Sequence, residues 1–402
     1  MGPLRSVNRI AAVLGRSLLS VLAALLIAAP AAGETAATPP QTAPAAAPPQ
    51  VYVLTMGPDT SVLFRHWGHA ALCVDARCFN YGVTDFSRPV GLGIEVLRGE
   101  AVFWVGVTRY EDTLADYLGA DRSVFRQDLD LGPEGRKRLL DRLAADLVPG
   151  RSEYVYDHFS DNCTTRIRDY LNEASGGARE RVTTAPNVPG GLEGSGTWRT
   201  HVRRGLAVRP SLLWLTDMGL GPAVDREVTP YEAMFLPEVL RHGLEEALGA
   251  PPVRLHLGRD GDVLPRDPGS RAYAPAAAGL AALLVALILL PGPPRLAAGA
   301  VAVGAGILTV VGLTALVTGL MSPLPIFRGS LAVLAVLPSD FLLATRHARW
   351  YGALRLMGGG LVGAALLFGW TSQPLGWTLG AAMAVVLAIV LRGIRKPHGK
   401  GR

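Results

Sequence analysis

The sequence predicts an α+β soluble domain that lies between membrane-inserting ends. Of its 402 residues, 49% are hydrophobic, which is high for an ordinary soluble protein. Long apolar runs gather near the two ends of the chain, whereas the middle alternates short strand-like runs with amphipathic helical ones. The net charge is +6. Much of this charge flanks apolar runs, so it indicates membrane topology rather than binding to nucleic acid.

The N-terminal segment has the pattern of an export signal. In residues 1–32, Arg5, Arg9 and Arg16 precede an apolar run that ends in small residues. This pattern is typical of a secretory signal peptide or an uncleaved signal anchor, and the sequence does not decide between them. Residues 33–49 are rich in Ala, Pro and Thr and predict a flexible linker. The next segment is therefore expected to be exported.

Residues 50–270 are the predicted soluble domain. Its strand candidates combine β-branched and aromatic residues between turn signals: 52–56, 69–74, 79–83, 102–107 and 124–131. Its helix candidates carry apolar residues at helical spacing: 134–147, 211–220 and 231–248. Thr229 to Glu232 has the pattern of a capping box, and Pro237 should kink or break the helix that follows. A Gly-rich loop is expected at 190–196, and a mostly helical stretch that includes 211–220 is expected to follow it.

Residues 271–393 hold five apolar segments, each close to the roughly 20 residues that cross a bilayer core. They are 273–291, 296–320, 326–345, 351–371 and 374–392. The loops 322–325 and 372–374 carry no Lys or Arg, whereas the loops on the opposite side and the basic tail, 394–402, do. This asymmetry predicts five transmembrane helices with the tail in the cytoplasm and the soluble domain outside. Arg328 is the one exception.

Asp340 lies within the third apolar segment. A carboxylate inside a membrane is a functional hypothesis by default. Because Asp340 falls near the predicted cytoplasmic end of its segment, a solvated helix end is the simpler interpretation.

The stretch 154–171 carries the strongest chemical signal of the soluble domain. It begins as a short strand, passes through the helix-capping types Ser160, Asp161 and Asn162, and continues at helical spacing. Cys163 therefore sits in the first turn of a helix. Unpaired N–H groups and the helix dipole there favour a thiolate and can hold an oxyanion. The alternative is a buried structural cysteine. The expected substrate or oxyanion contacts are Asn162, Thr164, Tyr81 and Arg166.

His69 is the favoured base for this thiol. If Cys73 and Cys78 face each other across a hairpin, then His69 and Asn80 share a sheet face as diagonal neighbours. Asn80 would then orient the imidazole of His69. A Cys73–Cys78 disulfide would suit an oxidising compartment and leave Cys163 as the free thiol. His158, which is close to Cys163 in sequence, is a rival base. The alternative role for His69 is structural, as a strand histidine whose hydrogen bonds are all made within the fold.

The sequence favours chemistry without a metal or cofactor. No His/Cys spacing matches a zinc site, and no Gly-rich phosphate loop precedes a helix in the required way.

Taken together, these motifs resemble a known family. The motifs are Trp67 to Leu72, Phe79 to Gly82 with Asp85-Phe86, Asp161 to Asp169, and the later Phe235-Leu236-Pro237. They look like the periplasmic domain of the Lnb-type bacterial lipoprotein N-acyltransferases, and the multi-span C-terminal region is similar too. The domain also resembles circularly permuted papain-like (NlpC-type) thiol enzymes, in which a strand histidine precedes the helix-start cysteine. The related lecithin:retinol acyltransferase group carries a second polar residue where Asn80 stands.

The resemblance implies an enzyme of the bacterial inner membrane whose catalytic domain lies in the periplasm. Its implied reaction moves an acyl chain from a membrane phospholipid or lipoprotein, through a thioester on Cys163, to the N-terminal amine of a diacylglyceryl-modified lipoprotein. His69 and Asn80 would complete the catalytic centre. No cofactor, metal or nucleic acid is implied.

Three other functions stay open from the sequence. A membrane-anchored cysteine peptidase or amidase acting on cell-wall peptide would use the same residues, and so would a phospholipid acyl hydrolase. A non-enzymatic membrane assembly or transport protein would not need the thiol of Cys163.

Overall fold

The computed structural model describes residues 51–177 and 196–395. The predicted signal segment 1–32, the linker 33–49, most of the Gly-rich loop 190–196 and nearly all of the basic tail 394–402 lie outside the described residues.

A seven-stranded antiparallel sheet forms the centre of the soluble domain, with the strand order β6-β4-β3-β2-β1-β5-β7. The strands are β1 (Val51–Met56), β2 (His69–Val74), β3 (Arg77–Val83), β4 (Val102–Arg109), β5 (Val124–Asp128), β6 (Glu153–Val155) and β7 (Val253–His256). The five strand candidates from the sequence correspond to β1 through β5. β6 is the short strand predicted before Cys163. β7 was not predicted, because its four residues are exposed or half-buried and show no clear apolar alternation.

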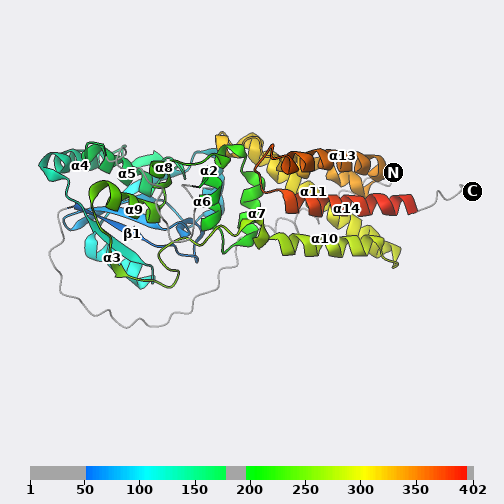
Figure 1. The fold of residues 1–402 in the computed structure, drawn as a ribbon, viewed down its shortest axis with the longest axis horizontal. Helices are drawn as coiled ribbons and strands as arrows, with labels where there is room; N and C mark the ends of the chain where they lie inside the picture. Colours follow the sequence, from blue (N-terminus) through cyan, green and yellow to red (C-terminus); the bar gives the residue numbers. More distant parts are fainter. Residues whose placement is uncertain (1–50, 178–195, 396–402) are drawn as a thin grey trace, which may run out of the picture. The chain divides into compact units, whose positions relative to one another are not determined.

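Helices cover both faces of this sheet (Figure 1). Helices α4 (Gly132–Asp146) and α5 (Cys163–Ala174) pack on one face, against alternate residues such as Leu72 and Tyr81. Helix α3 (Tyr110–Gly119) packs on the other face, against Cys73 and Cys78. The alternation of side chains along β2 and β3 thus supplies two separate cores.

Four further helices complete the soluble domain. They are α6 (Trp198–Gly205), α7 (Pro210–Gly219), α8 (Pro230–Ala233) and α9 (Pro237–Leu248). The predicted capping box forms between Thr229 and Glu232, and the chain breaks at Pro237 as predicted. Two helices were not predicted, α2 (Pro89–Arg98) and α3. Helix α2 contains Gly91 and Gly93 and has no side-chain N-cap, so its local sequence signals are weak.

The C-terminal part is built from long apolar helices. Figure 1 shows α10 (Ala274–Leu289), α11 (Pro294–Met321), α13 (Ala348–Leu367) and α14 (Gly376–Arg395) running side by side. By length and composition, four stretches of the described chain are able to cross a membrane: Pro294–Met321, Pro325–Ala344, Ala348–Leu367 and Gly376–Ile394. Helix α10 has 16 residues and is shorter than these. The number of five crossings therefore stays a prediction.

The third apolar segment is not one continuous helix. It consists of a 3-10 turn at Pro325–Phe327, the short helix α12 (Ala332–Ala335) and a 3-10 helix at Pro338–Ala344. Pro338 interrupts the backbone ladder, because a proline has no N–H to donate. Backbone carbonyls that leave a helix inside a membrane need other partners.

Asp340 and Arg355 provide partners for this broken segment. The Arg355 guanidinium donates to the carbonyls of Leu334 and Ala335 at 3.2 and 2.7 Å, and to Asp340 Oδ1 at 2.7 Å. Asp340 is fully buried. The interpretation of Asp340 as a solvated helix end is therefore wrong: its charge is paired inside the helical bundle.

Contacts join helix α7 to the apolar helices. Trp214 Nε1 donates to Thr378 Oγ1 at 2.9 Å, and Ser330 Oγ donates to the carbonyl of Met218 at 2.8 Å. Tyr273, just before α10, donates to Asp217 of α7 at 2.9 Å. The soluble domain is thus attached to the apolar helices through packed side chains, in addition to the covalent connection.

Candidate active site

Helix α5 begins in a complete capping box centred on Asn162. Asn162 Oδ1 accepts hydrogen bonds from the backbone N–H groups of Thr164 and Thr165, both at 2.8 Å, and Thr165 Oγ1 accepts from the N–H of Asn162. These bonds fix the first turn and so fix the position of Cys163. Cys163 is the free cysteine of the described chain and is half-buried. Its thiol is therefore held on a rigid helix start.

The thiol lies where strands β2 and β3 separate. Their paired residues run from Val74–Arg77 to Leu72–Phe79, and the register of β3 then shifts between Asn80 and Val83. The N–H of Ala70, which pairs with β1 but lies beyond the end of the β2–β3 pairing, donates to the sulfur of Cys163. The opening in the sheet thus supplies a backbone donor to the thiol.

Gly82 shapes the end of β3 beside the sulfur-bearing residue. Its φ of +90° is a conformation that other residues rarely adopt. A Cβ added there would lie 3.5 Å from Cys163 Cβ, an ordinary van der Waals distance. The backbone conformation, and not the space beside Cys163, therefore requires the glycine of the Asn-Tyr-Gly motif.

His69 and Asn80 come together as the hairpin register predicts. His69 Nε2 lies 3.4 Å from Asn80 Oδ1, and the imidazole also hydrogen-bonds the thiol of Cys163. With Nε2 directed at Asn80, the nitrogen available to the sulfur is Nδ1. An imidazole that donates from Nε2 leaves Nδ1 unprotonated, which is the form that can accept the thiol proton.

A chain of hydroxyl groups orients the Asn80 amide. Asn80 Nδ2 donates to Thr108 Oγ1 at 2.9 Å, Thr108 Oγ1 lies 2.5 Å from Thr113 Oγ1, and Thr113 Oγ1 donates to the carbonyl of Arg109 at 3.0 Å. Since Thr113 gives its proton to that carbonyl, Thr108 donates to Thr113 and accepts from Asn80. This one-directional chain turns the Asn80 oxygen toward His69.

The surroundings of Cys163 favour the thiolate. Burial alone raises the pKa of the thiol, but the neighbouring His69 lowers it through charge and hydrogen bonding, with help from Thr164 and the N–H of Ala70. The net effect lowers the pKa of Cys163 to about 7. A thiol with this pKa is substantially ionised at neutral pH and is a competent nucleophile.

The predicted oxyanion contacts mostly have structural partners. Asn162 uses its carbonyl oxygen in the cap and donates its amide hydrogens to the carbonyls of His158 and Phe235 at 2.8 and 3.1 Å. The N–H of Thr164 is bonded to Asn162, while its hydroxyl lies 3.6 Å from the Cys163 sulfur. Of these two residues, only Thr164 has a side chain that contacts the thiol.

Tyr81 and Arg166 have other partners. Tyr81 is fully buried and donates to Asp146 Oδ2 at 2.8 Å. Arg166 forms two hydrogen bonds with Asp161, at 2.6 and 2.9 Å, and lies over the ring of Tyr154. The contacts of both residues are those of a packed framework around helix α5.

The rival base His158 lies in an aromatic cluster. Its ring contacts Trp67 at 4.7 Å between centroids, and its Nδ1 faces Tyr156 Oη at 3.1 Å. Burial lowers the pKa of His158 to about 4, so its imidazole is neutral at pH 7. The histidine that hydrogen-bonds the thiol is His69.

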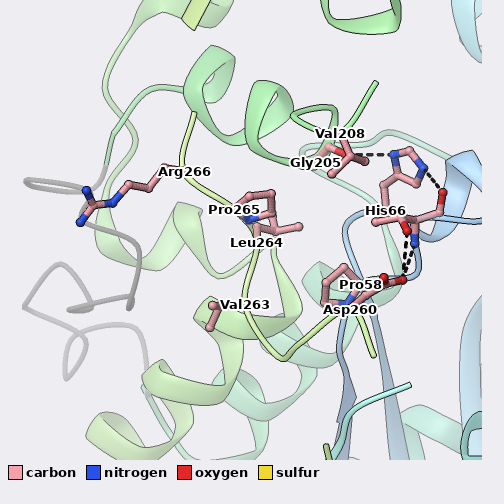
Figure 2. A pocket seen from close by; sticks show the side chains of 10 residues that line it. Pro58, His66, Gly205, Val208, Asp260, Val263, Leu264, Pro265 and Arg266 are labelled. Atoms are coloured by element: carbon pink, nitrogen blue, oxygen red, sulfur yellow. Dashed lines mark hydrogen bonds between the residues drawn. The ribbon is translucent and has the colours of Figure 1, made fainter. Parts of the chain in front are cut away.

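His66 lines a separate hollow of about 380 Å³ (Figure 2). Its two ring nitrogens face the carbonyls of Gly205 and Thr60 at 2.9 and 3.3 Å. Cys163, His69 and Asn80 are not among the residues that line this hollow. His66 therefore braces the loop before β2 and does not belong to the thiol site.

Cys73 and Cys78 are joined by a disulfide and face each other in the β2–β3 pairing. The prediction that His69 and Asn80 lie close together assumed this Cys73–Cys78 pairing. It lies in the core beneath α3.

The sequence did not assign roles to several residues that support the site. Tyr117 of α3 stacks on His69 with ring centroids 6.0 Å apart. Pro237 packs close to Gly68, where an added Cβ would lie 2.6 Å from the Met56 carbonyl. The carbonyl of Phe235, two residues earlier, holds Asn162. The Phe-Leu-Pro motif thus supports both the histidine strand and the cysteine helix, a role that no local pattern reveals.

Comparison with known proteins identifies the soluble domain. Residues 51–204 match the family model described as the Lnb N-terminal periplasmic domain. No curated protein and no solved structure matches the chain. The match contains the sheet through β6 and the Cys163 helix, together with His69 and Asn80. The papain-like resemblance stays a prediction. Among the described residues, no group of three His, Cys, Asp or Glu side chains is arranged to hold a metal ion.

Proposed function

Because residues 51–204 are an Lnb-type periplasmic domain, we propose that this membrane protein is a lipoprotein N-acyltransferase that works through a thioester on Cys163. The observation that carries the proposal is the pairing of a half-buried thiol of pKa about 7 with His69 at a capped helix start. A thiol, a base and an orienting amide form the arrangement that acyl-transfer enzymes use to activate a nucleophile.

In the first half-reaction, the Cys163 thiolate attacks the carbonyl carbon of an acyl ester. The C–S bond forms, the bond between the acyl carbon and the ester oxygen breaks, and the departing alkoxide takes a proton from the His69 imidazolium. The products are an S-acyl cysteine and the deacylated lipid alcohol.

In the second half-reaction, the amine of the acceptor attacks the thioester carbonyl. His69 accepts a proton from the attacking nitrogen, an amide bond forms, and Cys163 leaves as a thiolate. The N–H of Cys163 lies at the helix start, where the dipole favours the oxyanion of both tetrahedral intermediates.

Two features support membrane lipids as the donor class and lipidated protein termini as the acceptor class. The soluble domain contacts the apolar helices through α7, which holds it next to the membrane. The family description places domains of this type in the periplasm, where bacterial lipoproteins carry their lipidated N-terminal cysteine. A donor ester and an acceptor amine are then both presented at the membrane surface.

The test is intact-lipopeptide mass spectrometry in a bacterial host depleted of its own lipoprotein N-acyltransferase. The wild type and Cys163→Ala are compared at equal membrane levels, with His256→Gln as a matched histidine control for His69→Gln. His256 pairs with Asp121 at the sheet edge, away from the thiol. We expect one additional acyl mass on the lipoprotein N-terminus with the wild type and His256→Gln only.

Unchanged lipoproteins in cells that contain folded, exported wild type would refute the proposal. Release of fatty acid without acceptor modification would instead indicate a phospholipid hydrolase, and cleavage of cell-wall peptide would indicate an amidase.

A further inference from the structure

An exposed apolar patch lies on the soluble domain beside the site. We define the apolar patch as Val62, Leu63, Phe86, Val90 and Ile94. Each of these side chains is at least 36% exposed, and Val90 reaches 54%. Val90 and Ile94 are four residues apart in α2 and so share one helix face. Phe64 contacts Phe86 at 5.8 Å between centroids, which brings the turn containing Leu63 to the start of α2.

The helix that carries this patch touches the periplasmic ends of the apolar segments. A Cβ added at Gly99, the C-cap of α2, would lie 3.1 Å from Leu324 Cδ2. Leu324 follows α11, whose last residues Leu320 and Met321 are 76% and 55% exposed. Such exposure is expected of side chains that face lipid. The apolar patch therefore continues an apolar surface that begins on the membrane-spanning helices.

Charges at the edge of the patch compensate one another. Arg88 lies 3.5 Å from Asp85 and 3.7 Å from Glu95. Arg88 is therefore offset by these two carboxylates, and the side chains of the patch itself carry no charge. Gly93, between Val90 and Ile94, has open space where a Cβ would lie, so no part of the described chain covers this face there.

We infer that the apolar patch inserts into the bilayer surface, so that the soluble domain contacts lipid directly through α2 and the turn at Leu63. The occupant of the patch is lipid, because the patch is continuous with the lipid-facing end of α11. The contact is driven by burial of apolar side chains, and added salt should change it little.

The apolar patch is also connected to the thiol site by aromatic contacts. Phe86 of the patch contacts Phe103 at 6.4 Å between centroids, and Phe103 stacks on Tyr156 at 4.4 Å. Burial raises the pKa of the Tyr156 hydroxyl, and the neighbouring Cys163 raises it further. A packed row of aromatic side chains, with Phe103 buried, therefore connects the apolar patch to the surroundings of the thiol. Only this consequence rests on the proposed function.

Site-directed fluorescence tests the inference. An NBD fluorophore is attached at Ile94→Cys in a Cys163→Ala background, with the protein reconstituted into phosphatidylethanolamine/phosphatidylglycerol vesicles that contain doxyl-labelled lipids. The matched control is Val148→Cys, since Val148 is 47% exposed and Ile94 is 45% exposed. Val90→Cys provides a second position on the same helix face, in case the first variant folds poorly.

The inference predicts several-fold stronger quenching by shallow doxyl lipids at positions 94 and 90 than at position 148, with little effect of salt. Equal quenching at all three positions would overturn it. Protection of positions 94 and 90 from both doxyl lipid and aqueous iodide would also overturn it, because it would show that a protein segment covers the patch. The readout needs no turnover, so failure of the proposed acyl transfer would leave it unaffected.

Discussion

The buried Asp340–Arg355 pair and the polar groups around Cys163 differ in how their hydrogen bonds are arranged. In the apolar region, Asp340 accepts hydrogen bonds from Arg355, Tyr351 and the N–H of Leu337, and Arg355 also bonds two backbone carbonyls. Each of these charges is matched, and Asp340 is closed off from solvent. At Cys163, the neighbouring donors point at a single sulfur, on a residue that is half-buried.

The difference separates a structural role from a reactive one. The Asp340–Arg355 pair compensates for a broken helix at a depth where unpaired backbone groups are costly. The groups around Cys163 instead stabilise a charge on an atom that is free to form a new bond. The presence of buried ionisable groups alone would not distinguish these sites, but the partners of the central atom do.

The largest expected effect is loss of acyl transfer in Cys163→Ala. Removal of a nucleophile should lower the transfer rate by at least about 10³-fold. The capping box depends on Asn162 and Thr165, not on the thiol, so thermal unfolding should change little. Lipopeptide mass spectrometry and a thermal melt of the same preparation check both statements. Retained transfer with a normal melt would remove Cys163 from the reaction.

Asp340→Ala should show the converse pattern. It leaves the Arg355 charge buried without its partner, which typically costs about 3–5 kcal/mol. We expect a lower melting temperature and a lower membrane level, with normal transfer per folded molecule. If Asp340→Ala abolished transfer without loss of stability, the assignment of a structural role would be wrong.

His69→Gln should raise the pH at which the thiol becomes reactive. In the wild type, the pKa of Cys163 is lowered to about 7, chiefly by His69 against the effect of burial. The thiolate fraction therefore rises with pH around 7 in the wild type. Without His69 the midpoint should move upward toward the ordinary value near 9. The rate of iodoacetamide labelling against pH measures this midpoint, and an unchanged midpoint would exclude His69 as the partner of the thiol.

Thr108→Val should produce the smallest effect. It removes the hydroxyl that accepts from Asn80, so the amide can rotate and present the wrong atom to His69. We expect the rate of acyl transfer to fall by roughly 10-fold or less, because one misoriented hydrogen bond costs about 1–1.5 kcal/mol. A steady-state rate measurement checks it, with Thr84→Val as a control hydroxyl that donates to the Val102 carbonyl. Equal losses in the two variants would show that the chain of hydroxyls has no specific role.

The sequence predicted the parts of the site that depend on local patterns. Asn162 precedes a helical repeat and caps it, and a Cys73–Cys78 pairing was sufficient to bring His69 and Asn80 together. Thr108 could not be found this way, because it is 28 residues from Asn80 and reaches it only through the β3–β4 pairing. The broken third apolar segment was missed for a similar reason. Its composition suits a continuous helix, whereas Arg355 of α13 stabilises the interrupted one.

The most direct test of acyl transfer through Cys163 is to trap the acyl-enzyme. Purified protein is incubated with phospholipid in the absence of an acceptor amine, and its mass and modified residue are determined by intact-protein and peptide mass spectrometry. The thioester mechanism predicts one acyl chain on Cys163, which neutral hydroxylamine removes and which is absent from Cys163→Ala. Transfer to an added lipopeptide without any acyl-enzyme, or with the chain on another residue, would contradict it.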